Sequence, residues 1–510
     1  MLLTMLWAIM LLALFGRRGF GLSHPTSLLR QSTRKSLATW RGTNERGPTS
    51  IRGGYQRIAR KPPPRTGTSY LRAFDSEEAE FDESQAKPAA RTRAKVFVDK
   101  PFFYHEELDV VIEDITNLGV GIARHALAPN SSWVIMVPLV LPGERVRVRI
   151  FRNFESYSEA DLVHILEPSP DRVEPLCPYF ATCGGCQYQM MTVPAQRRWK
   201  RAQVEQLMAR IGGVDLSVHP VAPVVGSEHV YGYRSKITPH YNSPKVAKDL
   251  KVGFQQRGTR IVIDVAQCVI ATPNINNEYR KAREHLSATI AKKLPKKGAT
   301  LLFREGLDGA IETDFRRDMQ EVVQAGGRNV TFTFKAGEFF QNNPHVLPLM
   351  VDHVLSLARG DGVEHLIDAY CGSGLFSLCG SQSFVSVTGV EVSDLAVRAA
   401  TSNARSNGIA NAKFLCGSSE AIFDKVQHLP RDQTVIILDP PRKGCDRLFL
   451  SQLFAFGPKK IVYVSCDPAT QARDIKMIVE EGKYHITDIT PFDLFPQTRH
   501  IENVVALVRD

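Results

Sequence analysis

Two short apolar runs in the last fifth of the chain are each followed by a residue that can do chemistry. Asp439 follows the run 434–438 directly, and Cys466 lies two residues beyond the run 460–464. Both runs are continuous and rich in β-branched residues, which predicts strands buried on both faces. The segment between them fits one helix, so the unit predicts a parallel pair. Because ligands bind at the carboxyl ends of such strands, we expect Asp439 and Cys466 to face one crevice.

Cys466 is a candidate nucleophile. A thiolate is the strongest common nucleophile among side chains, and a cysteine just beyond a buried strand is held rigidly. Cysteine is also one of the most frequently buried residue types, so this position alone fits inert packing equally well. The rest of the sequence has to separate these two roles.

The net charge of +11 comes from one end of the chain. Between Gly16 and Phe74 there are eleven Arg and two Lys against one acid, Glu45, so this segment carries +12 and the remainder −1. The bulk charge of the body therefore does not indicate nucleic-acid binding, and any such site must be a local patch.

Residues 1–74 are predicted to be a presequence. Leu2–Phe15 is an apolar run typical of a signal-peptide core, and Arg17–Arg72 has the Arg-rich, acid-poor composition of a transit peptide. In series they resemble the bipartite presequence of algae with complex plastids, so we expect a plastid location, with the mitochondrion as the alternative and no membrane association of the mature form. The acidic and Ala/Pro-rich residues 75–100 predict a disordered linker.

Residues 101–170 are predicted to form a small β-barrel of the OB kind, because five short alternating runs are separated by Gly, Pro and Asn turns. Arg147, Arg149 and Arg152 lie on or just after one of these strands. They could contact a phosphate backbone, and a solvated strand face explains them equally well.

Four cysteines have the spacing of metal ligands. Cys177, Cys183 and Cys186 lie within ten residues, with two glycines between the last two, and Cys268 follows much later. Four thiolates fit either a [4Fe–4S] cluster or structural zinc, and a disulfide pair is less favoured inside an organelle.

The rest of the segment 171–335 is predicted to be mixed α/β. Residues 193–211 have the period of an amphipathic helix, whose early turns carry a basic face that we interpret as solvated. Aromatic and basic residues nearby would suit stacked single-stranded bases. These two groups are Arg197, Arg198, Lys200 and Arg201 on the helix, and Tyr231, Tyr233, Arg234, Lys236 and Arg257 beyond it.

The segment 336–510 is predicted to bind a nucleotide-like cofactor. A strand ending near Asp368 runs into the glycine turn Gly372-Ser-Gly374, and Glu391 closes the next strand. Glycines at such a turn let a ligand approach the backbone, and an acid there can accept both ribose hydroxyls. The turn alone also fits dinucleotides; Asp368 and Asp439-Pro-Pro441 favour S-adenosylmethionine.

Two motifs resemble the RNA (uracil-5-)-methyltransferase family, from about Glu107 to the C-terminus. One is Asp439-Pro-Pro-Arg-Lys-Gly444 followed, after sixteen residues, by Ile461–Thr470; the other is Phe492–Glu502. The resemblance implies that Cys466 is the nucleophile and Glu502 the base.

The same resemblance implies an α/β fold with a Rossmann-like class I methyltransferase domain, an N-terminal OB-like barrel of the TRAM type and a mixed α/β central domain. This chain departs from the family's pattern at Leu375, where the family often has a polar residue. The site residues that the resemblance implies would be Gln341, Tyr370, Glu391 and Asp439 for S-adenosylmethionine, and Cys177, Cys183, Cys186 and Cys268 for a [4Fe–4S] cluster, which the resemblance favours over zinc.

The expected reaction methylates C5 of a uridine. Addition of the Cys466 thiolate at C6 would activate C5, and Glu502 would then remove the C5 proton. Both groups must reach one uracil ring, so the uridine has to leave its stack, and Cys466 and Glu502 have to lie at one edge of the sheet.

The predicted partner is RNA and the predicted state is a monomer. The barrel and the cysteine motif favour 23S-type rRNA of the organelle over position 54 of tRNA. The alternatives are an amino-group or cytosine-C5 methyltransferase, which Arg442 and Ser465-Cys466-Asp467 disfavour, and a non-catalytic RNA-binding or assembly factor, which the intact Cys466 and Glu502 oppose.

Overall fold

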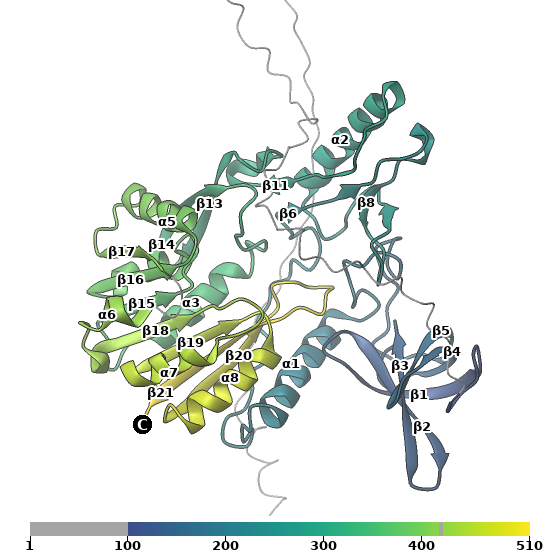
Figure 1. Ribbon diagram of the computed structural model, residues 1–510, viewed down its shortest axis with the longest axis horizontal. Helices are drawn as coiled ribbons and strands as arrows, with labels where there is room; N and C mark the ends of the chain where they lie inside the picture. Colours follow the sequence, from purple (N-terminus) through teal and green to yellow (C-terminus); the bar gives the residue numbers. More distant parts are fainter. Residues whose placement is uncertain (1–99, 418–421) are drawn as a thin grey trace, which may run out of the picture. The chain divides into compact units, whose positions relative to one another are not determined.

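The computed structural model describes residues 100–417 and 422–510, all of which belong to one compact unit, Thr68–Asp510. Figure 1 shows the arrangement of its helices and strands. The predicted presequence and all but the last residue of the predicted linker lie outside the described residues. No helix among the described residues has the length and apolar character needed to cross a membrane.

The first five strands close into a small barrel, as predicted. Their order around the barrel is β1-β2-β3-β5-β4, and the inward residues of one strand, such as Val146, Val148 and Ile150, are fully buried. The assignment to the OB or TRAM type stays a prediction. The strands are β1 (Glu107–Ile115), β2 (Val120–Ala128), β3 (Ser131–Pro138), β4 (Arg145–Asn153) and β5 (Tyr157–Glu167).

The outward arginines of the barrel have acidic partners on neighbouring strands. Arg147 lies 2.8 Å from Asp109, Arg149 lies 2.7 Å from Glu107, and Arg152 lies 3.6 Å from Glu159. Exposed pairs of this kind contribute about 0–1 kcal/mol each. A phosphate would have to compete with these acids for the same guanidinium groups.

The central segment is mixed α/β, with two long helices and small sheets. The helices are α1 (Val193–Arg210) and α2 (Pro273–Lys292). The sheets have the orders β10-β7-β8-β9 and β12-β11-β6, and β13 pairs with β14. Their bounds are β6 (Lys236–Ile237), β7 (His240–Tyr241), β8 (Val252–Gln255), β9 (Val262–Asp264), β10 (Ala299–Thr300), β11 (Phe303–Glu305), β12 (Ile311–Glu312), β13 (Asp318–Ala325) and β14 (Arg328–Lys335).

The C-terminal segment forms a seven-stranded sheet with the order β17-β16-β15-β18-β19-β21-β20. The strands are parallel except for β21, which is antiparallel to both of its neighbours. The strands are β15 (His365–Ala369), β16 (Ser386–Glu391), β17 (Ala412–Cys416), β18 (Thr434–Leu438), β19 (Lys460–Ser465), β20 (Tyr484–Phe492) and β21 (Glu502–Arg509), and the helices are α3 (Leu347–Ala358), α4 (Leu375–Gly380), α5 (Asp394–Ser406), α6 (Ile422–Val426), α7 (Arg447–Phe456) and α8 (Pro468–Glu480).

The predicted parallel pair is confirmed. Strands β18 and β19 run side by side in parallel, and all residues of both are buried. The two faces of the sheet carry separate apolar cores: Ile437 belongs to the core that includes α3, and Ile436 to the core that includes α7 and α8. This second core also contains Val204 and Met208 of α1, so α1 packs on the C-terminal sheet although the sequence places it before the central sheets.

Candidate functional site

Cys466 and Glu502 lie at the same edge of the sheet. Cys466 directly follows β19, and Glu502 is the first residue of β21. Because β21 is antiparallel to β19, with Ser465 opposite Asn503, the end of one strand lies beside the start of the other. Cys466 is half-buried and Glu502 is 4% exposed. The geometric requirement set by the sequence is therefore met.

The electrostatic environment links four groups at this edge. Burial, followed by the Glu502 and Asp439 carboxylates, raises the pKa of Cys466 to about 11, whereas Arg442 opposes this rise by its charge and by a hydrogen bond. Burial and then Asp439 raise the pKa of Glu502 well above its usual range, again against Arg442. Arg442 therefore stabilises negative charge on both groups.

A pocket opens at Cys466. Its lining comes from five parts of the chain: the β1–β2 loop of the barrel, α1, the segment after β18, the segment after β19, and the β20–β21 loop. Neither the barrel loop nor α1 was predicted to line the site, because no local pattern marks such contacts. The lining residues are Asn117, Gln203, Val204, Leu207, Arg442, Cys466, Asp467, Pro468, Arg499, His500 and Ile501.

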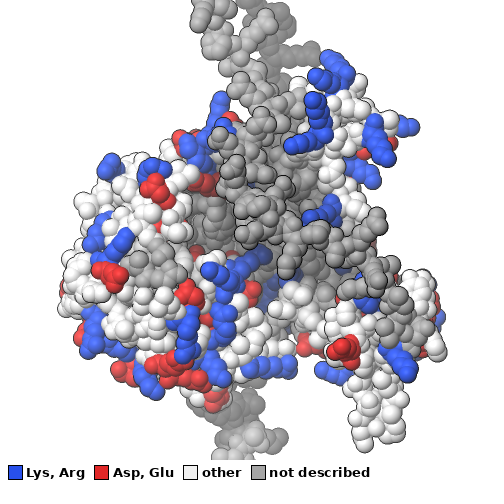
Figure 2. Space-filling view, viewed as in Figure 1, with Lys and Arg blue, Asp and Glu red and all other residues white. Residues whose placement is uncertain are grey.

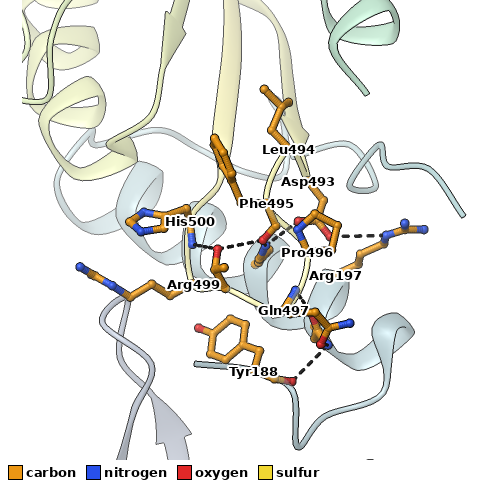
Figure 3. Close-up of polar contacts among 12 residues, drawn as sticks. Tyr188, Arg197, Asp493, Leu494, Phe495, Pro496, Gln497, Arg499 and His500 are labelled. Carbon is orange, nitrogen blue, oxygen red and sulfur yellow. Dashed lines mark hydrogen bonds and ion pairs between the residues drawn. The ribbon is translucent and has the colours of Figure 1, made fainter. Parts of the chain in front are cut away.

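The β20–β21 loop, residues 493–501, is held by buried contacts with α1. Lys200 Nζ lies 2.6 Å from Asp493 Oδ1, and both side chains are fully buried. Gln196 donates to Gln497 Oε1 at 3.0 Å and accepts from the Gln497 backbone N–H at 2.9 Å. Figure 3 shows this loop beside Arg197, whose Nε lies 3.8 Å from Asp493 Oδ2. The loop that carries His500 is thus positioned by α1.

Two sequence interpretations are wrong here. Lys200 is not part of a solvated basic face, because it is buried against Asp493; Arg198 and Arg201 are more exposed and pair with Asp171 and Glu205. Tyr233 cannot stack on a base, because its ring is fully buried and its hydroxyl donates to the Pro496 carbonyl at 3.0 Å.

His500 faces the pocket as a neutral group. Burial, together with the cations Arg499, Arg442, Lys200 and Arg234, lowers its pKa to about 4. An uncharged imidazole can both donate and accept a hydrogen bond, which suits contact with a neutral base. The sequence indicated His500 only as part of a motif.

The predicted cofactor residues begin at the glycine turn after β15. Tyr370 (φ 65°), Gly372 (φ 53°) and Gly374 (φ 92°) lie in the left-handed region. A Cβ at Gly374 would also lie 3.2 Å from Leu378 and Phe414, so glycine is needed there. Glu391 accepts from the backbone N–H of Gly372 at 3.2 Å, which ties the end of β16 to this turn.

Carboxylates lie at the ends of three neighbouring strands: Asp368 on β15, Glu391 on β16 and Asp439 just after β18. Burial raises the pKa of Asp368 to about 7, with a contribution from Glu391, and burial and Asp368 raise the pKa of Asp439 to about 7. Ser377 donates to Asp368 Oδ2 from its N–H and its hydroxyl, whereas the buried Oδ1 has no partner among the described residues. A cationic ligand beside these acids would favour their ionised forms, and S-adenosylmethionine carries a sulfonium and an ammonium group.

Two further positions bear on the predicted cofactor site, Gln341 and Leu375. Gln341 is 8% exposed, and its segment is tied to the β20–β21 loop because Asn343 donates to the Leu494 carbonyl at 2.9 Å. Leu375 begins α4, is half-buried and packs against the core of the sheet. It therefore contributes packing and no polar group.

Three of the four cysteines of the predicted metal site act electrostatically on the fourth, Cys186. Burial, together with the negative charge that Cys268, Cys183 and Cys177 would carry as thiolates, raises the pKa of Cys186 to about 12. Within residues 100–417 and 422–510, no group of three or more His, Cys, Asp or Glu side chains is arranged to hold a metal ion. The cluster stays a prediction.

The fold and the acid-lined edge define a class: a Rossmann-like, S-adenosylmethionine-dependent methyltransferase. The model of the tRNA (uracil-5-)-methyltransferase family matches residues 264–510. The tRNA (uracil(54)-C(5))-methyltransferase of Schizosaccharomyces pombe is 36% identical over 96% of this chain and 91% of its own length. That of Saccharomyces cerevisiae is 36% identical over 80% of this chain and 74% of its own length.

A solved structure is also similar. The tRNA (uracil-54, C5)-methyltransferase of Pyrococcus abyssi, in complex with S-adenosyl-L-homocysteine, has a TM-score of 0.58 and 24% identity, covering 79% of this chain and all of that one. The chain belongs to the RNA (uracil-C5)-methyltransferase family, an enzyme family that methylates C5 of uridine with S-adenosylmethionine.

Proposed function

We propose that this enzyme methylates uridine through a covalent bond between Cys466 Sγ and C6 of the base, with Glu502 as the general base. The observation that carries the proposal is the meeting of Cys466, Glu502 and Arg442 at one sheet edge, beside the acids that would face the cofactor.

The chain's own residues supply the chemistry around the methyl group, which S-adenosylmethionine provides as an electrophile when bound. The Cys466 thiolate adds to C6, and the electron pair of the C5=C6 bond moves toward C5 and O4. After C5 has taken the methyl group, the Glu502 carboxylate removes the C5 proton. The C5=C6 bond re-forms and the thiolate leaves, so the nucleophile is regenerated.

Arg442 supports both the addition of the Cys466 thiolate and the removal of the C5 proton by Glu502. Its guanidinium hydrogen-bonds to the Cys466 thiol and lowers the pKa of both Cys466 and Glu502 against the effect of burial. Because two groups with raised pKa have to ionise, this cation favours the reactive forms at neutral pH.

For the RNA, we propose position 54 of tRNA, the substrate in the names of the two yeast relatives. The sequence favoured 23S-type rRNA of an organelle on the barrel and the cysteine motif. The alignment with the Schizosaccharomyces pombe enzyme leaves only 4% of this chain unmatched, so most of the barrel is matched in an enzyme named for tRNA. The barrel by itself therefore does not favour rRNA, which remains the second candidate.

We also propose that Cys177, Cys183, Cys186 and Cys268 hold a [4Fe–4S] cluster, with zinc as the alternative. The effect of Cys268, Cys183 and Cys177 on the pKa of Cys186 supports a shared site. Elemental analysis of the purified enzyme separates the two: iron and sulfide in about equal amounts support the cluster, and one zinc per chain contradicts it.

A plastid location and a monomeric state complete the proposal.

Trapping on RNA that carries 5-fluorouridine tests the mechanism. The fluorine at C5 cannot be removed as a proton, so the enzyme should stay covalently attached to the RNA in the presence of S-adenosylmethionine. The adduct should be absent for Cys466→Ala. Mass mapping of 5-methyluridine in tRNA and rRNA incubated with the enzyme then identifies the RNA; adduct formation by Cys466→Ala would contradict the proposed nucleophile.

A further inference from the structure

Two segments of the central region form a lysine-rich surface, here called the lysine tip. They are residues 242–251, between β7 and β8, and residues 292–298, at the end of α2 and before β10. Asp249 is the only acid in these two segments. All of their lysines are exposed; they are Lys245, Lys248, Lys251, Lys292, Lys293, Lys296 and Lys297.

The fold builds this surface from both segments together. Strand β7 pairs antiparallel with β10, with Tyr241 opposite Ala299, so the two segments leave the pair at the same end. Ser243 Oγ donates to the Pro295 carbonyl at 2.6 Å, and a Cβ at Gly298 would lie 2.2 Å from the Tyr241 carbonyl oxygen. The close approach needs glycine, and it brings the two sets of lysines together.

The underside of the tip is apolar and anchored. Ala247 and Leu250 pack against the core that contains Leu286 and Ile290 of α2. Their positions alternate with those of Lys245, Lys248 and Lys251, so the lysines point to the exposed side while their backbone is held. The backbone of the lysine tip is therefore held in place by packing against α2.

The lysines of the tip lack acidic partners in the part of the chain that the structure describes. No ion pair to any of these seven lysines is present within residues 100–417 and 422–510. Lys251 lies near enough to Asp264 to lower its pKa, but this carboxylate is already paired with Arg283 at 2.9 Å. The exposed arginines of β4, in contrast, have acidic partners on adjacent strands.

Figure 2 agrees with this difference: Lys and Arg predominate on the visible face around α2 and β8, whereas both signs are mixed over the C-terminal sheet domain. The part of the chain outside residues 16–74 has a net charge of −1. A local excess of six positive charges within such a body marks a site for a polyanion.

We propose that the lysine tip binds the phosphate backbone of the substrate RNA at a distance along the RNA from the target uridine. The inference rests on the proposed function for the identity of the polyanion. Lysines contact phosphates as point charges without reading the base, so the tip would strengthen binding of a long RNA and leave the chemistry at Cys466 unchanged.

The test compares two sets of three substitutions. Lys292→Gln/Lys293→Gln/Lys296→Gln removes charge from the tip, and Lys281→Gln/Lys413→Gln/Lys476→Gln removes the same charge from exposed lysines elsewhere. Methylation is measured on full-length RNA and on a short stem-loop carrying only the target uridine, over a range of salt concentrations. Retained cofactor binding and melting temperature show that each variant is folded.

For the tip variant we expect KM for full-length RNA to rise about tenfold at about 0.15 M salt, with kcat within about twofold. The slope of log KM against log salt should become shallower by about 0.7–0.9 for each phosphate that the tip no longer neutralises, and KM for the stem-loop should not change. An unchanged slope, an equal rise in KM for the control variant, or a fall in kcat alone would each overturn the inference.

The same data separate this inference from the proposed function. If the parent enzyme methylates neither RNA, the proposed function fails. If the parent is active and the tip variant binds full-length RNA like the parent but loses binding to vesicles of phosphatidylserine and phosphatidylcholine, the tip serves a lipid surface and the RNA inference is overturned.

Discussion

The chain contains two groups of reactive side chains that are held in different ways. Cys466 and Glu502 lie at the ends of sheet strands, where the register of β19 and β21 fixes their relation. The four cysteines lie in loops, where Cys183 is tied by an isolated bridge to Gln256 and Cys268 by a hydrogen bond to Asn276. A sheet places reactive groups without a ligand, whereas loops of this kind gain from a ligand that joins them.

The two groups also differ in the partners that surround their thiols. Burial raises the pKa of Cys466 to about 11 and that of Cys186 to about 12. The Cys466 thiol has a hydrogen bond to the cation Arg442, whereas Cys186 has one to the neutral amide of Gln189. Only the first arrangement would let a buried thiol act as a nucleophile without a bound ligand, as proposed for Cys466.

The strongest test of this comparison is Cys466→Ala. We expect turnover to fall by about 10⁴-fold or more, because the step that activates C5 is lost, while cofactor binding stays unchanged. The matched control is Cys445→Ala, which removes a buried thiol 3.8 Å from the Tyr463 hydroxyl and should remain active. Transfer of a labelled methyl group to RNA measures both, and comparable losses would remove the distinction.

Glu502→Gln should have the next largest effect. The amide cannot take the C5 proton, so we expect a loss of about 10²–10⁴-fold in turnover, with a covalent enzyme–RNA adduct that accumulates. A denaturing gel detects the adduct on unmodified RNA. A loss of activity without any adduct would place Glu502 before the covalent step.

Lys200→Met tests the support of the β20–β21 loop by α1. Removing the ammonium leaves Asp493 buried without its 2.6 Å partner, which we expect to cost about 3–5 kcal/mol in the free energy of unfolding. Arg198→Ala on the same helix breaks only an exposed pair with Asp171 and should cost about 0–1 kcal/mol. Urea unfolding measures both, and equal losses would contradict the role of the buried pair.

The pH dependence of turnover tests the raised pKa values. With a pKa of about 11, the Cys466 thiolate is a minor form at pH 7 and increases as pH rises, and the raised pKa of Glu502 moves the ionisation of its carboxyl group in the same direction. We therefore expect turnover to increase with pH by up to about tenfold per unit between pH 7 and 9. Arg442→Ala should move the profile to higher pH, since Arg442 lowers both pKa values. A profile that falls with rising pH would contradict this assignment.

Cys186→Ser should have the smallest effect on the chemistry. We expect kcat to stay within about threefold of the parent, because Cys186 does not line the pocket at Cys466, while metal content and melting temperature fall. Elemental analysis and thermal unfolding measure these. A loss of turnover as large as that of Cys466→Ala would show that the two groups act together.

The strands and their chemistry could be predicted from the sequence because they depend on local patterns. The run 434–438 was predicted to its residues, and the run 460–464 ends one residue before β19 does. Asp439 and Cys466 then had to share an edge, since parallel strands end on the same side.

What could not be predicted depends on contacts between distant parts of the chain. The helical period shows that Lys200 shares a face with its neighbours, but not that Asp493, 293 residues later, covers it. The lining of the pocket by Asn117 of the barrel and Gln203 of α1 has no local signal either. For the same reason Tyr233 looked available for stacking while Pro496 in fact covers its hydroxyl.

The position of α1 on the C-terminal sheet has a consequence for biosynthesis. Val204 and Met208 leave the ribosome long before β20 and β21, with which they share a core. Until those strands emerge, the apolar side of α1 lacks its partner and invites capture by chaperones. Cys466, too, emerges before the β20–β21 hairpin that bears Glu502, so under the proposed mechanism the nascent chain becomes competent for methylation only when this hairpin closes.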